Sequence, residues 1–222
     1  MAGKYEVQGL CVDVTYMVLG PIENNVYIIS DGKGTFVVDP SCRADRILAA
    51  LGDRKLDAIV ITHHHYDHTE AAEEIRRATG AAVYASKIDA PLIEDPKEVG
   101  TSGIARPCKV DRRVSHGDVV RIGDMEWKVI LTPGHTEGSI CLYLPPQFGN
   151  HPKGLPVLIS GDTLFAGATG RTDFEGGSMS DMAASMKKLA KLPDDVAVLP
   201  GHNDLTTIGA ERRRVFARFG AR

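Results

Sequence analysis

The sequence predicts an α/β protein folded as a single domain over residues 1–222, and two observations support this prediction. Short apolar, β-prone runs alternate with segments of helical spacing along the whole chain. Four of the apolar runs are followed within a few positions by histidine or aspartate, and strand ends of this kind gather around ligand sites in α/β proteins. A chain of 222 residues is long enough to bury roughly 70% of its unfolded surface without further cross-links.

The composition excludes several classes of partner. The net charge is only -3 and acids and bases are interspersed along the sequence, so no nucleic-acid partner is expected. The N-terminus lacks an apolar signal core and no run approaches membrane-spanning length, so we expect a cytoplasmic protein without a membrane partner. The four cysteines show no CxxC spacing and are expected to be small buried hydrophobic residues: Cys11, Cys42, Cys108 and Cys141.

The first half of the chain begins with β-prone runs separated by turn residues. Strands are predicted at residues 9–18, 25–30, 35–39, 56–61 and 81–85, with a hairpin turn at 31–34. Helices are predicted at residues 43–51 and 69–80, and the second of these has acids early, bases late and a terminal glycine. Three prolines interrupt residues 86–109, which are predicted to form a short helix and a loop.

The second half repeats this plan. A hairpin is predicted at residues 118–131, and further strands at 139–144, 156–160 and 196–199, with a loop at 145–156. Ser178 and Asp181 are spaced as a capping box for a helix that ends near Leu192. A basic helix is predicted at residues 206–219.

The run at residues 62–68 is the strongest indication of chemistry, because it lies where a predicted strand ends and a helix begins. Residues two apart share a face of an extended chain, so His63 and His65 can converge on one point while His64 faces away. A second point nearby is within reach of the next two candidate ligands, Asp67 and His68. Imidazole and carboxylate together suit zinc, iron or manganese.

Three more candidate ligands follow other predicted strands at their carboxyl ends. They are His135, Asp162 and His202, two of them in Pro-Gly-His sequences. Because the loops at these strand ends meet at one rim, they are expected to join the first group. His116 and His151 follow no strand and are expected to be solvated turn residues.

The pattern His63-x-His65-x-Asp67-His68, followed by the three residues above, resembles the ligand set of the metallo-β-lactamase-fold hydrolases. The resemblance implies a four-layer αββα sandwich, in which two mixed sheets are flanked by helices and the metals lie at one edge. It implies that one metal is held by three histidines, His63, His65 and His135. It implies that the second metal is held by Asp67, His68 and His202, and that Asp162 bridges the two.

Shorter motifs resemble one branch of this superfamily more closely. Residues 132–136, 161–165 and 170–173 are similar to those of glyoxalase II, the hydroxyacylglutathione hydrolase, and of its short single-domain bacterial relatives. The resemblance implies hydrolysis of a small-molecule thioester by a hydroxide held between two divalent metal ions, with zinc favoured over iron or manganese. Two-domain glyoxalase II enzymes use a helical domain after the last histidine to bind glutathione. Only twenty residues follow His202, so a permissive site for the thiol carrier is expected.

Several alternatives stay open. A persulfide dioxygenase would use a single iron on His63, His135 and Asp162, and that branch also has the Gly-Arg-Thr-Asp-Phe sequence found at residues 170–174. A lactonase or β-lactamase is a further alternative, whereas a purely structural metal site is disfavoured because such sites are usually closed and thiolate-rich. Asp67 can be read as a metal ligand or as a proton shuttle.

Two sets of residues near the expected site have less certain roles at this stage. Arg171 could bind a substrate carboxylate or form a structural ion pair with Asp173. An early loop is expected to border the metal rim, and its polar residues are Asn24, Asn25 and Tyr27.

Overall fold

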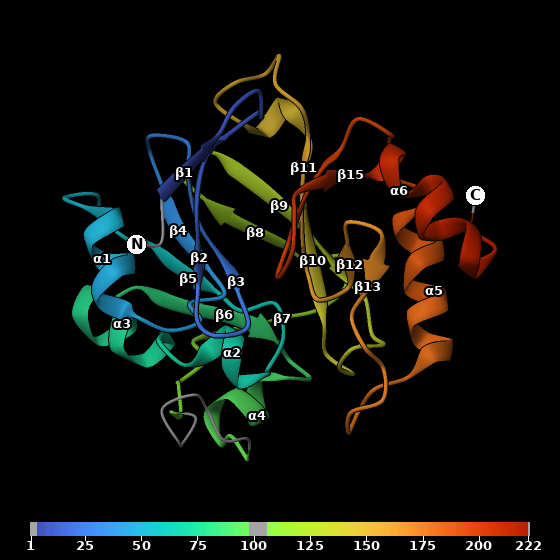
Figure 1. The fold of residues 1–222 in the computed structure, drawn as a ribbon. Coiled ribbons are helices and arrows are strands. Elements are labelled where there is room, and N and C mark those ends of the chain that lie inside the picture. The colour runs from blue at the N-terminus through green and yellow to red at the C-terminus, as the bar shows by residue number, and fades with distance from the viewer. Residues whose placement is uncertain (1–3, 98–105, 222) are drawn as a thin grey trace.

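The computed structural model describes residues 4–97 and 106–221, and within them two mixed β-sheets pack face to face with helices on their outer faces (Figure 1). The first sheet has the strand order β1(Lys4–Val7), β2(Asp13–Leu19), β3(Asn24–Ser30), β4(Thr35–Val38), β5(Ala58–Val60), β6(Ala82–Ser86) and β7(Arg112–Val114). The second has the order β15(Thr206–Thr207), β14(Ala197–Pro200), β11(Val157–Gly161), β10(Ile140–Leu144), β9(Met125–Leu131) and β8(Val119–Ile122). A small separate pair is formed by β12(Leu164–Phe165) and β13(Ala168–Thr169). The expected αββα sandwich is confirmed.

Helices cover the two sheets from opposite sides. On the first sheet lie α1(Ala44–Leu51), α3(Ala72–Thr79) and α4(Ala90–Glu94), and on the second lie α5(Met179–Leu189) and α6(Ile208–Arg214). The remaining helical segments are α2(Tyr66–Thr69), η1(Pro146–Phe148) and η2(Phe216–Phe219). The short helix expected within residues 86–109 is therefore α4, while residues 98–105 of that segment lie outside the described part of the chain.

Three apolar layers hold the sandwich together. The central layer lies between the sheets, where Phe36 of β4 and Trp127 of β9 meet edge to face with ring centroids 5.4 Å apart. Ile75 of α3 and Met186 of α5 belong to the two outer layers, each between helices and one sheet. Burying one such side chain stabilises the fold by about 1.5–3 kcal/mol, so the large residues on both faces of each sheet fix the layers relative to one another.

Both predicted hairpins are present, and one aspartate connects them. Between β3 and β4, the Asp31 carboxylate accepts hydrogen bonds from the backbone N–H groups of Lys33 and Gly34 at 2.9 and 2.8 Å. Its other oxygen accepts one from the N–H of Asp124, at the turn between β8 and β9, at 2.6 Å. This buried carboxylate therefore links turns that belong to different sheets.

The predicted helices differ from the observed ones in two places. The helix expected at 69–80 begins only at Ala72 as α3, and the separate turn α2 precedes it, because the N–H of Ala71 donates to the carbonyls of Pro40 and Ser41 (3.0 and 3.1 Å) instead of joining the two helices. The helix expected at 206–219 begins as strand β15, which pairs with β14, and Thr207 then caps α6 by accepting from the N–H of Ala210 at 3.1 Å. Both differences arise from tertiary hydrogen bonds.

The strand prediction also needs correction at the edges of the first sheet. The strand expected at 9–18 is β2, and Leu10 makes only an isolated bridge to Leu155. Neither β1 nor β7 was predicted. Their strand conformation depends on pairing with β2 and β6, whose registers no local pattern reveals.

Three of the four cysteines are buried as expected, and Cys42 is half-buried. All four are free thiols, and burial raises the pKa of Cys11 and Cys141 to about 11 and that of Cys108 to about 12. Across residues 4–97 and 106–221, no helix combines the length and apolar composition that crossing a membrane requires.

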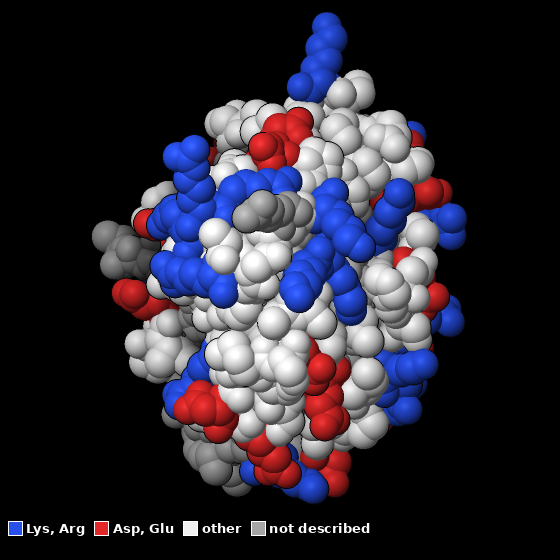
Figure 2. Space-filling model, turned by 90° about the vertical axis from the view of Figure 1, so that its right-hand side faces the viewer, with Lys and Arg blue, Asp and Glu red and all other residues white. Residues whose placement is uncertain are grey.

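Charge is less evenly distributed on the surface than along the sequence. Lys and Arg side chains gather over part of the face formed by α5, α6 and the C-terminal segment (Figure 2). Arg212 of α6 has a structural role: it pairs with Asp194 at 2.7 Å and also donates to the carbonyls of Ala190 and Leu192 just beyond the end of α5.

Candidate metal centre

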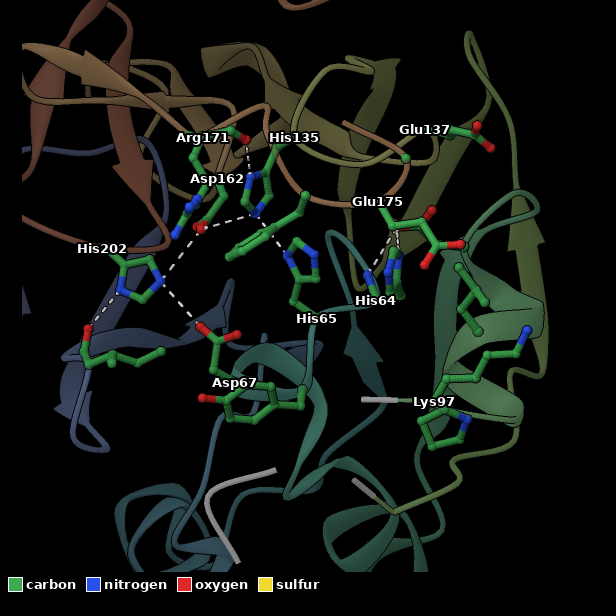
Figure 3. A pocket seen from close by; sticks show the side chains of 18 of the residues that line it. His64, His65, Asp67, Lys97, His135, Glu137, Asp162, Arg171, Glu175 and His202 are labelled. Atoms are coloured by element: carbon green, nitrogen blue, oxygen red, sulfur yellow. Dashed lines mark hydrogen bonds and ion pairs between the residues drawn. The ribbon is translucent and has the colours of Figure 1, made fainter. Parts of the chain in front are cut away.

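The seven candidate ligands converge at one edge of the sandwich, on loops that follow β5, β9, β11 and β14. Figure 3 shows several of them pointing toward one another from different elements: His65, Asp67, His135, Asp162 and His202. His64 is directed to the carboxylate of Asp89 instead, with Nδ1 3.1 Å from Oδ2.

One group consists of three buried histidines. His65 Nδ1 and His135 Nε2 lie 2.8 Å apart, and the His63 ring lies 4.8 Å from both rings by centroid. One nitrogen from each of the three residues falls within 4.8 Å of the others. His63 Nε2 is buried and has no hydrogen-bond partner in the described part of the chain, which leaves its lone pair available to a metal ion.

A second group lies beside the first. Asp67 Oδ2 is 3.3 Å from both His68 Nε2 and His202 Nε2. The two residues of α2 come from its first turn, and the third comes from the loop after β14. The structure therefore brings Asp67 and His68 together at a second point beside the first, as the run at residues 62–68 predicts.

Asp162 lies between the two groups. Its Oδ2 is 3.5 Å from both His135 Nε2 and His202 Nε2, and its Oδ1 is 3.4 Å from His68 Nε2. One carboxylate therefore faces both clusters, which is the placement expected of a bridging ligand. Glycine is required beside it: a Cβ at Gly201 would overlap the Asp162 carboxylate and lie 2.7 Å from Cε1 of His68.

Hydrogen bonds on the outer side of two rings fix which nitrogen faces the centre. His68 Nδ1 lies 3.0 Å from Asp39 Oδ2, so Nδ1 carries the proton and Nε2 is left as the ligand atom. Thr62 Oγ1 donates to the same carboxylate oxygen at 2.7 Å and therefore accepts from His63 Nδ1 at 3.1 Å.

Backbone carbonyls do the same for two more rings, those of His135 and His202. His135 Nδ1 donates to the carbonyl of Arg171 at 2.7 Å, and His202 Nδ1 donates to the carbonyl of Ile22 at 3.0 Å. A carbonyl oxygen can only accept, so both rings carry the proton on Nδ1 and present the Nε2 lone pair inward. Partners outside the cluster thus orient four imidazoles so that Nε2 faces the centre, the orientation that metal ligation requires.

The electrostatics of the two groups differ. Burial, with the neighbouring histidines, lowers the pKa of His63 well below its usual value and the pKa of His65 to about 3. These rings are therefore neutral at physiological pH, as metal ligation requires. For Asp67 of the second group and for Asp162 between the groups, burial opposes ionisation, but nearby histidines outweigh it and hold the pKa of both carboxyls below their usual range.

His68 shows the opposite shift. Burial lowers its pKa, but the carboxylates around it outweigh this effect and raise the pKa well above its usual value: Asp162, Asp67 and Asp39. The second group therefore attracts positive charge. Its carboxylates and imidazoles fit a divalent ion of the zinc, iron or manganese type.

A model of the metallo-β-lactamase superfamily matches residues 19–202, which is most of the chain. The chain belongs to the metallo-β-lactamase superfamily. It is 31% identical over 199 residues to the hydroxyacylglutathione hydrolase GloC of Haemophilus influenzae, covering 86% of this chain and 90% of that protein.

Two solved structures extend this comparison. The B3 metallo-β-lactamase BLEG-1 is 32% identical, with a TM-score of 0.81 and coverage of 90% of this chain and 97% of that one. TTHA1623, solved in a di-iron-bound form, is 32% identical with a TM-score of 0.76, covering 89% and 96%. The chain is therefore a metallo-β-lactamase-fold hydrolase with a His/Asp metal-binding cluster, and divalent metal ions are its cofactors.

In this superfamily member the cluster opens into a cavity of about 1050 Å³. Asp67 and Asp162 line its floor together with histidines of both groups. Apolar side chains form much of the wall, among them Leu92 and the buried Phe165. Three of the apolar lining residues are exposed to solvent: Ile22, Ile88 and Phe174. A substrate of small-molecule size can therefore reach the metal centre from solvent.

Arg171 lines the cavity, but its side chain is already engaged. The guanidinium makes two hydrogen bonds to Asp173, at 2.7 and 2.6 Å, and lies 3.9 Å from the ring centroid of Phe174. The structure thus shows the ion pair that was one of the two predictions for this residue. Its backbone carbonyl, which holds His135, is a contribution that the sequence did not indicate.

Sequence reasoning missed two buried aspartates behind the centre. Asp39 accepts from the N–H and hydroxyl of Thr62, both at 2.7 Å, and pairs with His68. Asp89 accepts from the backbone N–H of His64 at 2.9 Å and from the hydroxyl of Thr136 at 2.8 Å. The available signal for Asp39 was its position at the carboxyl end of a predicted strand, whereas no signal marked Asp89.

His116 and His151 are exposed and lie away from the cluster, as expected. The three polar residues expected in an early loop lie instead in strand β3, and they border the cluster. Asn25 donates to the carbonyls of Pro200 and Asn203 at 3.0 and 2.8 Å, and the hydroxyl of Tyr27 donates to Pro200 at 2.7 Å. These bonds hold the loop that carries His202.

Proposed function

We propose that this chain hydrolyses small-molecule thioesters of the hydroxyacylglutathione type with two divalent metal ions, zinc being favoured and iron or manganese the alternatives. The observation that carries the proposal is the position of Asp162, between two ligand groups on the floor of an open cavity. The likeness to GloC of Haemophilus influenzae supports the choice of substrate.

When bound, two ions that share a carboxylate supply a hydroxide nucleophile near neutral pH and polarise the substrate carbonyl. In this proposal Asp162 is the bridging ligand. Asp67 is a metal ligand and not a proton shuttle in this proposal, because nearby histidines hold the pKa of its carboxyl below the usual range and keep it ionised. A thiolate leaves without a strong general acid, so the chain needs no further proton donor for this reaction.

We further propose that the site is permissive toward the thiol carrier. The described residues that line the cavity end at Asn203, whereas η2 packs against α5 and α6, and α6 packs against η2 and β15. Remote contacts to the carrier are therefore few, and such contacts are what an enzyme uses to select the non-reacting part of a substrate. Changing the carrier at constant acyl group should alter kcat/KM by less than about tenfold, or roughly 1.4 kcal/mol.

The first test is hydrolysis of S-lactoylglutathione and of the same acyl group on a truncated thiol. Activity should be abolished by chelation and restored by zinc, manganese or iron. Alanine at His63, His65 or His135 should reduce kcat/KM by several orders of magnitude, while His116→Ala, an exposed control, should not. Full activity in the metal-free protein would refute the proposal.

The second test addresses the two-ion arrangement. Protein purified without chelator should contain close to two ions per chain. Asp162→Ala should lose occupancy at both positions because one carboxylate faces both groups, whereas His202→Ala should mainly lose one. Unchanged metal content in Asp162→Ala would rule out the bridging role.

A β-lactam hydrolase is a second candidate, favoured by the TM-score of 0.81 to BLEG-1. A chromogenic cephalosporin, a lactone and glutathione persulfide, the last with oxygen uptake as the readout, complete the substrate panel. Oxygen consumption without thioester hydrolysis would instead indicate the single-iron dioxygenase on His63, His135 and Asp162.

A further inference from the structure

Asn24, at the start of β3, lies inside the metal centre although it belongs to neither ligand group. The N–H of Asn25 donates to the carbonyl of Gly201 at 2.7 Å, and Asn24 forms an isolated antiparallel bridge with His202. This backbone pairing fixes the Asn24 side chain beside the second group, where it is only 1% exposed.

The amide nitrogen of Asn24 is spaced like a ligand of that group. Nδ2 lies 2.7 Å from Asp67 Oδ2, 3.3 Å from His68 Nε2 and 3.4 Å from His202 Nε2. The Asp67 oxygen is itself 3.3 Å from each of these imidazole nitrogens. The separations from the two imidazole nitrogens are of the size found between atoms that bind one metal ion at about 2.0–2.1 Å. An ion held by Asp67, His68 and His202 together with Asp162 would therefore lie within reach of the Asn24 carboxamide as an additional ligand.

The other end of the same carboxamide is unsatisfied. Asn24 Oδ1 is buried and receives no hydrogen bond within the described part of the chain. Buried polar atoms without a partner are uncommon and need an explanation. Oxygen and nitrogen of a carboxamide have nearly the same size, so a half-turn about the Cβ–Cγ bond exchanges them without moving the rest of the side chain.

We propose that Asn24 is a ligand of the second metal ion. Its NH₂ group donates to Asp67 when the site is empty, and its oxygen takes that position when a cation is bound, because a cation repels the NH₂ dipole and attracts the carbonyl. A neutral oxygen ligand suits manganese and iron as well as zinc. This inference rests on the metal centre alone and is independent of the thioester substrate.

The alternative role is that of a positioning residue that only orients Asp67 by hydrogen bonding. Two variants separate the roles. Asn24→Ala removes both the oxygen and the donor, whereas Asn24→Asp keeps an oxygen but puts a carboxylate where the donor lies, 2.7 Å from Asp67. A ligand role tolerates the second change, and a donor role does not.

The experiment is a competition titration of the protein with zinc or manganese against a chromophoric chelator, so that both dissociation constants are measured without substrate. Asn24→Ala should weaken the second constant at least tenfold and leave the first unchanged. Asn24→Asp should bind the second ion as tightly as wild type or more tightly. Asn150→Ala is a matched control, since it deletes an exposed carboxamide that donates to Asp13 at 3.0 Å, and it should change neither constant.

Two outcomes would overturn the assignment: an unchanged second constant in Asn24→Ala, or an Asn24→Asp variant that binds the second ion more weakly than wild type. Circular dichroism of the chelated proteins checks folding. If the alanine variant does not fold, the nearly isosteric aspartate variant decides on its own. If the metal constants behave as expected but the metal-loaded wild-type protein hydrolyses no thioester, the proposed substrate would be refuted and the role of Asn24 would stand.

Discussion

Replacing Asp39 with asparagine should weaken the second metal position without removing any ligand. One carboxylate oxygen accepts from the N–H of Thr62, so it must remain an oxygen in the variant. The new NH₂ group then faces His68 Nδ1. It can only donate there, which forces the proton of His68 onto Nε2, the atom that points into the centre.

The magnitude follows from the bond that is lost. A hydrogen bond to a charged group contributes about 1.5–3 kcal/mol, which corresponds to roughly 10- to 150-fold in affinity. Removing an outer partner of a metal-bound histidine typically costs about 10- to 100-fold, in agreement with this value. Asp39 has φ of 46°, a left-handed conformation that asparagine also tolerates, so the backbone adds little to the effect.

Chelator competition measures this effect directly. The second dissociation constant of Asp39→Asn should rise at least tenfold, while the first changes far less. Asp31→Asn is the matched control, because Asp31 also accepts several backbone hydrogen bonds but lies in a turn away from the centre. It should lower the melting temperature and leave both constants unchanged. An Asp39→Asn variant with wild-type affinity at both positions would refute the tautomer argument.

Two further predictions concern packing and pH. Gly201→Ala should lose bound metal while still folding, because the added methyl overlaps the Asp162 carboxylate, and unchanged metal content would contradict this packing. Glu73→Gln should lower the free energy of unfolding by about 0.5–1 kcal/mol at pH 7, since Arg76 and Arg77 lower the pKa of the Glu73 carboxyl from 4.5 to about 2. Its folded pKa lies below the unfolded value, so the wild-type advantage should be complete above about pH 4.5 and fade toward pH 2. Denaturant titrations of both proteins across that range check the sign, and a difference that is independent of pH would contradict it.

Features with a local signature could be predicted from the sequence. The runs that become β5, β9, β11 and β14 are apolar and end just before histidine or aspartate, so the chain itself marks where each strand meets the centre. The hairpin at residues 31–34 was also predictable, because the Asp-Gly-Lys-Gly run supplies the turn conformation locally. Spacing along the strand–helix junction likewise placed His63 and His65 on one side and His64 on the other.

Features that depend on contacts between distant segments were decided only by the tertiary structure. Asp39 acts on His68 across 29 positions, and Asn24 reaches His202 across 178. The carbonyl that orients His135 belongs to Arg171, for which the sequence suggested only roles of the side chain. The break between α2 and α3 has the same origin, because the N–H of Ala71 donates to carbonyls of another loop, those of Pro40 and Ser41. Any residue type offers a backbone carbonyl, and any strand start can hold an asparagine. The sequence therefore determined which groups can bind metal, and the packing of the two sheets determined which atom of each group faces the ions and what holds it there.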